Sequence, residues 1–575
     1  MKNLFDTGKR DSDSKGIEKN FALYPLIGKS RSRFRRTGHS KLLQLVVIIP
    51  FIYAWHGIVI SAPAFTRYDA DGNTLVSALE IAAGTGIPRF HDQPNYPAQY
   101  ITAVLLWADM KLAKEENPTA YRNRVKENFD LYMVFPGVVG LFYTVVALVA
   151  LCSLAMLAFG PSACFLAVPV LLVGFPHLLP TFLITHPNAV CDYTGLLGVV
   201  IGCHGAVRGS KKRFVTGCAL IAAAGSLKLN FFPLLAAPFL FLAIEGMQKR
   251  KMPWRGVISF YVTALAVVAG ISAVLLAPFW LWPNICVTQF LAHLKGVSDF
   301  KLANHLATVK TQILSNHYLL FGAFLAMIFL RRTITFRSLI AASFILLAMP
   351  LLSPVNSYRY FRHAFTAFAV CTLMLPARLI ERRIRSISLK TSSKNSLFSD
   401  LKVIRLLIAL ICLTVLSAFA AKKNADMRQL ARTGQEMERI AFEICPVDGG
   451  CIWAVSSLYA PPILAWNQVM HEIYPDIMPR KFSPLRMAYT NSERIADMLS
   501  KNSFIIFIDQ DFLDYQEQYL PNSRRRLDSI LKDAVIILEF KLPNENIGWL
   551  ISSKEISESV IRRITGMSNK PFTER

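Results

Sequence analysis

The stretch LYMVFPGVVGLFYTVVALVALCSLAMLAF, residues 131–159, contains no charged side chain. It is longer than the roughly 20 helical residues that cross the hydrocarbon core of a bilayer. Similar apolar stretches recur between residues 42 and 421. The chain of 575 residues is 53% hydrophobic and only 18% charged, whereas a soluble domain carries about 25% charged residues. The composition therefore predicts an integral membrane protein built from helical spans.

We expect an α-helical polytopic membrane protein with about eleven transmembrane helices, followed by a small C-terminal α/β domain. The candidate spans are Leu42–Ala62, Leu131–Phe159, Ser162–Pro180, Cys191–Val207, Phe214–Leu227, Phe231–Gly246, Val257–Trp280, Tyr318–Leu330, Leu339–Leu352, Phe361–Leu379 and Val403–Ala421.

Lys and Arg gather in segments that fall on one side of the membrane if these spans alternate. The tail before the first span holds eleven of them, and the segment from Arg378 to Arg405 holds eight. Smaller clusters occur at Arg208–Arg213, Lys249–Arg255 and Arg331–Arg337. Basic loops mark the cytoplasmic face. We therefore expect a cytoplasmic N-terminus and an extracytoplasmic C-terminal domain.

The net charge of +25 also raises the question of a nucleic-acid partner. The basic residues do not form one footprint with interleaved aromatic side chains, as nucleic-acid binding requires. They lie beside membrane segments instead. We expect membrane lipids, and no nucleic acid, among the partners.

Three parts follow from this layout: a basic cytoplasmic tail at 1–41, a transmembrane catalytic domain at 42–421, and an extracytoplasmic domain at 422–575. The first outward loop, 63–130, is expected to contain a helix at Leu75–Ala83 and an amphipathic helix at Ala98–Lys114 that lies in the membrane interface.

In the C-terminal domain, short apolar runs alternate with helical patterns, which indicates a small α/β fold. Strands are expected at Ile452–Ser456, Ser503–Ile508, Ala534–Lys541 and Gly548–Ser552, with helices at Ala425–Ile444, Ser492–Leu499 and Arg524–Lys532.

The first outward loop opens with Thr66-Arg67-Tyr68-Asp69-Ala70-Asp71-Gly72. In an extended segment, Asp69 and Asp71 face the same side. The two carboxylates could thus converge on a divalent cation, Mg or Mn, or on the hydroxyl of an acceptor. The alternative is an Asx turn in which Asp71 caps the helix that follows.

Further charged residues stand at the outward ends of later spans. His186 and Asp192 flank the start of the fourth span, where Asp192 is either a functional carboxylate or a helix cap. Lys228 separates two spans that have almost no loop between them. It either extends to the interface, as lysines at span ends do, or binds an anionic lipid phosphate.

The segment Tyr358-Arg359-Tyr360-Phe361-Arg362-His363 is the third outward cluster. Positive charge on the outer side runs against the usual distribution, and arginine holds phosphate through paired hydrogen bonds. Tyr358, Arg359 and Arg362 are therefore candidates for substrate binding, together with Arg67.

This layout resembles the GT-C superfamily of membrane glycosyltransferases, which includes protein O-mannosyltransferases and bacterial aminoarabinose transferases. The resemblance covers residues 42–421. It consists of the cytoplasmic N-terminus, the acidic motif in the first outward loop, and Asp71-Gly72 followed by Ala78-Leu79-Glu80-Ile81-Ala82-Ala83-Gly84-Thr85-Gly86-Ile87-Pro88. Asp192 is similar to a second acidic position of the family. Ser226-Leu227-Lys228 and Tyr358-Arg359-Tyr360 are similar to basic positions that contact the donor phosphate.

The resemblance implies an inverting glycosyltransferase. It would transfer a sugar from a polyprenyl-phosphate donor to a glycan, lipid or protein acceptor on the outer face of the membrane. Asp69 or Asp71 would act as general base, where the family often has Asp-Glu or Glu. Two alternatives are a polysaccharide polymerase or ligase, and a transporter or flippase of lipid-linked sugars. The sequence does not distinguish the sugar, the acceptor, the metal requirement, the oligomeric state or the role of the C-terminal domain.

Overall fold

The computed structural model describes residues 41–54, 72–84, 86–88, 95–173, 188–247, 252–296, 302–352, 358–390, 406–422, 424–425 and 428, and five strands between 450 and 552. The strands span 450–454, 486–487, 504–509, 535–541 and 547–552.

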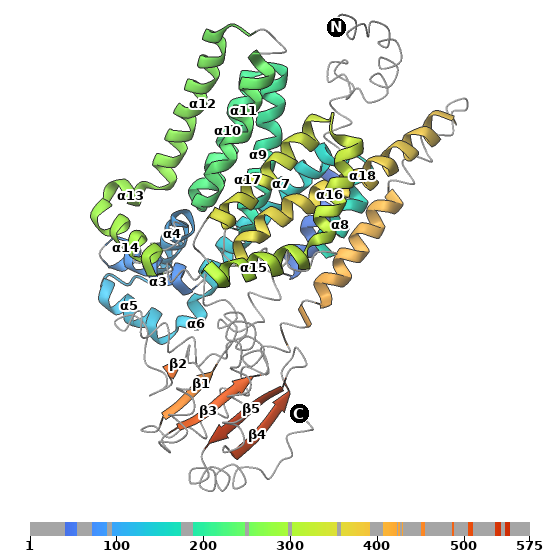
Figure 1. Ribbon diagram of the computed structural model, residues 1–575. Helices are drawn as coiled ribbons and strands as arrows, with labels where there is room; N and C mark the ends of the chain where they lie inside the picture. The colour runs from blue at the N-terminus through green and yellow to red at the C-terminus, as the bar shows by residue number, and fades with distance from the viewer. Residues whose placement is uncertain are drawn as a thin grey trace, which may run out of the picture.

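The described part of residues 41–422 is helical (Figure 1). In chain order the helices are α3 (Asn73–Ala83), α4 (Tyr96–Leu112), α5 (Pro118–Glu127), α6 (Phe129–Tyr132), α7 (Val134–Ala158), α8 (Cys164–Val173), α9 (Asn188–Arg208), α10 (Lys211–Leu227), η5 (Leu229–Leu235), α11 (Ala236–Phe241), η6 (Leu242–Met247), α12 (Trp254–Leu275), α13 (Ala277–Leu281), α14 (Pro283–Gly296), α15 (Leu302–Ser315), α16 (His317–Leu330), α17 (Ile334–Leu352) and α18 (Tyr358–Lys390). Two further helices are Lys41–Ala54 and Leu406–Lys422.

Each of the eleven expected spans contains a helix, which confirms an α-helical polytopic membrane protein. Within the described residues, five helices are long and apolar enough to cross a membrane alone, or up to six if one bent pair is a single span. Several others are shorter apolar helices. The segment expected as one span at Val257–Trp280 breaks at Leu276, two residues before Pro278, into α12 and α13.

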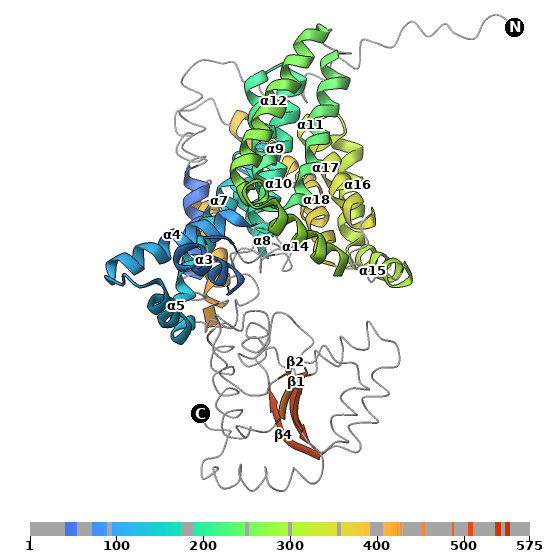
Figure 2. The ribbon, with the colours of Figure 1, turned by 90° about the vertical axis from the view of Figure 1, so that its left-hand side faces the viewer.

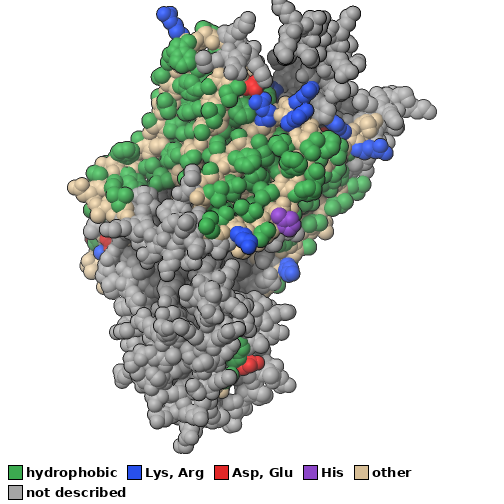
Figure 3. Space-filling model, in the orientation of Figure 1, with side chains coloured by type: hydrophobic (Ala, Val, Ile, Leu, Met, Phe, Trp, Pro, Cys, Tyr) green, Lys and Arg blue, Asp and Glu red, His purple; other side chains and the backbone are tan. Residues whose placement is uncertain are grey.

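The outer surface of the bundle is apolar. Helix α12 lies at the edge of the bundle in Figure 1, and α16 exposes Phe321, Phe324 and Phe329. In Figure 3, hydrophobic side chains cover the face over the helices, and most Lys and Arg side chains lie above that green surface. An apolar surface of this extent suits contact with lipid tails rather than water.

Helices α9 and α10 form the tightest pair. A Cβ atom added to Gly217 of α10 would lie 2.3 Å from the backbone nitrogen of Gly202 on α9 and 2.5 Å from the carbonyl oxygen of Gly198. Small residues allow membrane helices to approach this closely. The α9–α10 pair therefore has its backbones in direct contact, which fixes the residues at its ends relative to one another.

Helix α18 holds the turn between α7 and α8. The Arg378 Nε atom donates to the Ala158 carbonyl oxygen at 2.7 Å, and the Glu381 carboxylate accepts from the Ser162 N–H at 2.9 Å. Gly160, between them, has φ +100°. Cations favour the C-terminal end of a helix and anions the N-terminal end, so both side chains match the helix ends that they contact.

The C-terminal domain contains a five-stranded sheet of order β2-β1-β3-β5-β4. Its strands are β1 (Gly450–Ala454), β2 (Arg486–Met487), β3 (Phe504–Asp509), β4 (Val535–Lys541) and β5 (Ile547–Ser552). β1 pairs in parallel with β2 and β3, while β5 pairs antiparallel with β3 and β4. All four expected strands are present. Of the expected helices of this domain, only Ala425 and Arg428 of the first are described, and both are helical; the rest lie outside the described residues.

Figures 1 and 2 both place α3, α5 and the sheet at the same end of the helical bundle. Helix α3 confirms the helix expected at Leu75–Ala83, and α4 corresponds to the expected amphipathic helix. Helix α4 exposes Ile101, Val104 and Trp107, so it presents an apolar face away from the protein, as an interfacial helix does.

Candidate functional site

Four side chains from three parts of the bundle meet at one end of α9. Asn188 and Asp192 are one turn apart on that helix, Lys228 follows the last residue of α10, and His363 lies in the second turn of α18. The bonded pairs among these residues are 40, 135 and 171 positions apart in the chain. Their convergence is therefore a property of the tertiary fold.

Hydrogen bonds join the four in a chain. The Asp192 Oδ1 atom lies 2.7 Å from Nδ1 of His363, and Nε2 of His363 lies 2.9 Å from Nζ of Lys228. The same Nζ atom donates to Oδ1 of Asn188 at 2.7 Å. Asp192 and His363 are each 2% exposed. Polar groups buried this deeply are costly unless they are hydrogen-bonded, and the hydrogen bond between them supplies a partner to each.

Two local features place Lys228. Its backbone is extended, with φ −150° and ψ 108°, and this ends α10. The chain then continues into η5, whose Phe231 packs edge-on against the His363 ring with centroids 4.9 Å apart. The side chain of Lys228 is directed toward buried polar groups, so the structure does not support the alternative that it merely extends to the interface.

Asp192 is not a helix cap either. It lies beyond the first turn of α9, and its carboxylate is bonded to His363 on another helix. Arg362 lies within electrostatic reach of both His363 and Tyr193, the residue after Asp192. The structure thus brings together two of the expected site residues, Asp192 and Lys228, through His363, and Arg362 is the residue before His363 on α18.

The other expected site residues lie outside the described part of the chain or have undescribed side chains. Arg67, Asp69, Asp71 and His186 belong to the first group. Tyr358 and Arg359 occupy the first turn of α18, and only their backbone is described. In the described part of the chain no group of three or more His, Cys, Asp and Glu could hold a metal; the expected cation ligands Asp69 and Asp71 are not in that part.

Two site residues, Asn188 and His363, were not assigned from the sequence. Asn188 precedes Asp192 by four positions, and such residues share one face of a helix. This spacing is a signal that the sequence did carry. His363 adjoins Arg362, but nothing near it in the sequence identifies Asp192 as its partner, because the two residues are 171 positions apart.

The first outward loop is linked to the same end of α9. The Tyr143 hydroxyl of α7 donates to Oδ1 of Asn95 at the start of α4, at 2.7 Å. Tyr143 is also within electrostatic reach of Cys191, next to Asp192. The loop that carries the Asp69-Ala70-Asp71 motif therefore has its second helix anchored beside the site.

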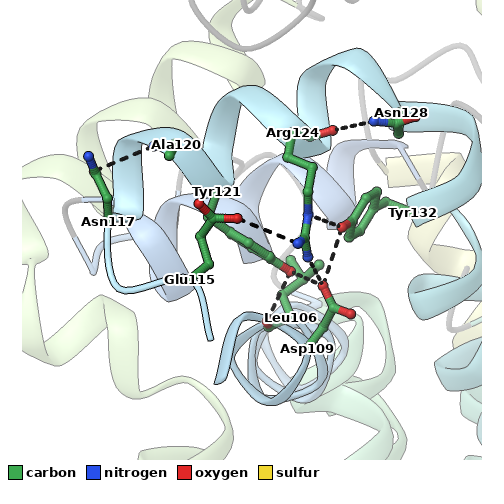
Figure 4. A network of polar contacts seen from close by, with 9 residues as sticks. All are labelled: Leu106, Asp109, Glu115, Asn117, Ala120, Tyr121, Arg124, Asn128 and Tyr132. Carbon is green, nitrogen blue, oxygen red and sulfur yellow. Dashed lines mark hydrogen bonds and ion pairs between the residues drawn. The ribbon is translucent and has the colours of Figure 1, made fainter. Parts of the chain in front are cut away.

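A polar network fixes the helices of that loop (Figure 4). The Asp109 carboxylate accepts from Nη2 of Arg124 at 2.8 Å and from the hydroxyls of Tyr121 and Tyr132 at 2.9 and 3.3 Å. Burial, followed by the hydrogen bond to Asp109, raises the pKa of Tyr121. The network ties α4 to α5 and α6.

The neighbouring Arg122 pairs with the buried Glu80 of α3. Arg122 and Arg124 are basic residues on the side expected to be outward. Acidic residues of the same loop neutralise the positive charges of both arginines. This neutralisation explains how an outward loop can carry basic residues, which usually gather on the cytoplasmic side.

No protein-family model matches the chain, and no curated protein matches it. Two similar solved structures are crystal structures of ArnT from Cupriavidus metallidurans. The one bound to undecaprenyl phosphate is 11% identical, with a TM-score of 0.43 over 89% of this chain and 98% of that chain. The apo structure is 12% identical, with a TM-score of 0.41 over the same shares.

Proposed function

We propose that this protein is an inverting glycosyltransferase of the bacterial inner membrane. It takes a sugar from a polyprenyl-phosphate donor and transfers it to a glycan, lipid or protein acceptor on the outer face. The observation that carries this proposal is the Lys228 ammonium group, which Asn188 and His363 hold at the end of the α9–α10 pair.

That end is opposite to the basic connection between α9 and α10, which contains Arg208, Lys211, Lys212 and Arg213. The expected topology makes this connection cytoplasmic, and the Lys228 end then faces outward. With that topology, Lys228 and Arg362 would lie near the outer membrane surface, where lipid phosphates are. An anionic lipid head group is their natural ligand.

In the proposed reaction, the acceptor hydroxyl oxygen attacks the anomeric carbon of the donor sugar. The bond between that carbon and the phosphate oxygen breaks, and its electron pair stays on the leaving polyprenyl phosphate. Asp69 or Asp71 takes the hydroxyl proton, a role that typically contributes ~10²–10⁴-fold. Lys228, Arg359 and Arg362 stabilise the charge that develops on the phosphate. A divalent cation held by Asp69 and Asp71 would add to that stabilisation.

The placement of the ionisable residues also bears on the transporter alternative. Asp192, His363 and Lys228 all lie at helix ends. A transporter usually has its charged site near the midplane, between repeated halves of the protein. The placement at one end favours an enzyme that meets its lipid substrate at the membrane surface.

The test uses purified protein in detergent, where there are no compartments and transport cannot occur. Lipid extract from a deletion strain supplies the donor, a cell-envelope fraction supplies the acceptor, and mass spectrometry measures the polyprenyl phosphate released. Release that requires both fractions is the expected result. If the protein leaves the donor intact in detergent but moves it between the leaflets of vesicles, the protein is a transporter and the proposed enzymatic function is wrong.

A further inference from the structure

We propose that His363 is a positioning residue: Asp192 fixes its tautomer, and its neutral Nε2 atom holds the Lys228 ammonium group in place for the phosphate of the lipid donor. This inference rests on the proposed function and adds two residues to it, His363 and Asp192, that act through Lys228 and do not touch the substrate.

The tautomer follows from the chemistry of the partners. An ammonium group has three donors and no acceptor, and an ionised carboxylate only accepts. His363 lies between the two, with Nδ1 facing Asp192 at 2.7 Å and Nε2 facing Lys228 at 2.9 Å. Nδ1 must therefore carry the hydrogen that is donated to Asp192, which leaves the Nε2 lone pair to accept from Lys228.

An alternative proton arrangement, with a cationic His363 and a neutral Lys228, has the same total charge. The reference pKa values are about 6.5 for histidine and about 10.4 for lysine. Because lysine has the much higher reference pKa, the proton resides on Lys228 unless the surroundings reverse the order of the two pKa values. Asp192 contacts His363 directly, but its negative charge stabilises a positive charge on His363 and on Lys228 alike. Asp192 therefore does not by itself move the proton from Lys228 to His363.

Packing restricts the imidazole ring to this orientation. The Phe231 ring lies edge-on to it at 4.9 Å between centroids, and His363 is 2% exposed. A ring that is buried, packed and bonded at both nitrogens cannot rotate without losing both hydrogen bonds. Lys228, whose four-carbon side chain is flexible by nature, thereby gains a fixed position.

A second proton on His363 would convert Nε2 into a donor that faces another donor. The charged groups around the ring are Asp192 from α9, Lys228 from the α10–η5 junction, and Arg362 on its own helix. Two of these three are cations, so protonation would push Lys228 away. Binding of the donor phosphate should therefore weaken as the pH falls through the titration of His363.

Three variants test the inference, with undecaprenyl phosphate as the probe and binding to purified protein in detergent as the readout. His363→Phe keeps a ring against Phe231 but removes both nitrogens, and it should weaken binding tenfold or more at pH 7.5. His363→Gln supplies an amide oxygen that accepts from Lys228 without titrating, and it should bind within about threefold of wild type. His204→Phe is the matched control. His204 is a half-buried histidine of α9 that is bonded to Thr335 of α17 at 2.9 Å, and it lies toward the end of α9 opposite to Asp192.

The pH profile separates positioning from a structural role. The ratio of wild-type to His363→Gln affinity should fall as the pH drops from 8 to 4, a range that extends well below the reference histidine pKa of about 6.5. The ratio is used because the lipid phosphate itself titrates near pH 6. If His363→Phe does not fold, as judged by its elution and thermal unfolding, Asp192→Ala takes its place. This variant removes the carboxylate that fixes the tautomer of His363, and it should also weaken the binding of undecaprenyl phosphate.

The outcomes distinguish the two proposals. If wild-type protein binds undecaprenyl phosphate and His363→Phe binds it equally well, His363 does not position Lys228, although the proposed function stands. A constant ratio across the pH range would also refute the positioning role. If the wild-type protein does not bind undecaprenyl phosphate at all, the proposed function itself is refuted.

Discussion

The Nδ1 atom of His363 lies 2.7 Å from Oδ1 of Asp192, although 171 positions separate the two residues in the chain. Asp192 belongs to α9, which packs against α10 through backbone contact at Gly202 and Gly217. His363 belongs to α18. Because Lys228 follows α10 directly, the packing of these helices determines whether its ammonium group reaches Nε2 of His363.

Lys228→Ala should raise the KM for the lipid-linked donor about tenfold to a hundredfold. A hydrogen bond to a charged group is worth ~1.5–3 kcal/mol, and this variant removes the proposed phosphate contact. The measurement is initial transfer rate against donor concentration in detergent. Lys211→Ala is the matched control, because Lys211 lies at the other end of α10 and donates to Oγ of Ser259 at 2.9 Å. Equal KM values for the two variants would make Lys228 a structural residue.

Asp69→Asn and Asp71→Asn should distinguish the general base from its neighbour. Each change keeps the size of the side chain and removes its charge. The base variant should lose about a hundredfold or more in kcat, the scale of a missing general base. The other variant should lose less. Membrane insertion serves as the control, and two variants with wild-type rates would disprove the assignment of the acidic motif.

Gly217→Ala should destabilise the bundle. The added methyl carbon would lie 2.3 Å from the backbone nitrogen of Gly202, so α9 and α10 must separate. Overpacking of this kind costs ~1–3 kcal/mol. Gly270→Ala on α12 is the matched control, because a methyl group there meets no atom within 4 Å. Thermal unfolding in detergent should show a lower Tm for Gly217→Ala alone. Donor affinity should fall with it, since Lys228 and Asp192 lie at the ends of these two helices.

Glu381→Ala should loosen the turn between α7 and α8. It removes the carboxylate that accepts from the Ser162 N–H and leaves a buried donor unsatisfied, which costs ~1–3 kcal/mol. Gly160→Ala should also destabilise, since Gly160 has φ +100° and its added carbon would lie 2.9 Å from Cγ of Glu381. In the double variant, the added methyl group of Gly160→Ala no longer meets the Glu381 side chain, so its steric cost disappears. The destabilisation of the double variant should therefore be smaller than the sum of the destabilisations of the two single variants. Strict additivity would show that the two residues do not interact.

Tyr121→Phe should destabilise the first outward loop at neutral pH. The phenol donates within the Asp109 network, and its pKa in the folded protein is raised by burial and by that hydrogen bond. Because the folded pKa exceeds that of an unfolded tyrosine, about 10, the stabilisation is complete below pH 10 and is lost as the pH rises above it. Wild type should therefore lose its advantage over Tyr121→Phe in alkaline solution. A difference in stability that does not change up to pH 11 would contradict this role.

Much of the fold could be predicted from the sequence, because the signals for it are local. Long apolar runs identified the helices, and short apolar runs identified β1, β3, β4 and β5. The strand β2 was missed, since only Arg486 and Met487 take part in it. Helices α14 and α15, between the expected spans that end at Trp280 and begin at Tyr318, were not predicted.

The candidate site was predicted less completely, because its geometry depends on helix packing. Charge at the span ends identified Asp192, Lys228 and Arg362 individually. The bond between His363 and Asp192 carries no local signal, and neither do the backbone contacts that align α9 with α10. Individual charged residues can be identified from the sequence, whereas their hydrogen-bond partners can be identified only from the tertiary structure.

The central claim, transfer of a sugar from a polyprenyl-phosphate donor, is tested most directly by mass spectrometry of envelope lipids from a deletion strain. We expect the strain to accumulate one polyprenyl-phosphate sugar and to lack that sugar in its envelope. The gene for the wild-type protein should reverse both changes, and the gene for Lys228→Ala should not. A deletion strain whose lipid-linked sugars and envelope sugars both match those of the parent would contradict the claim.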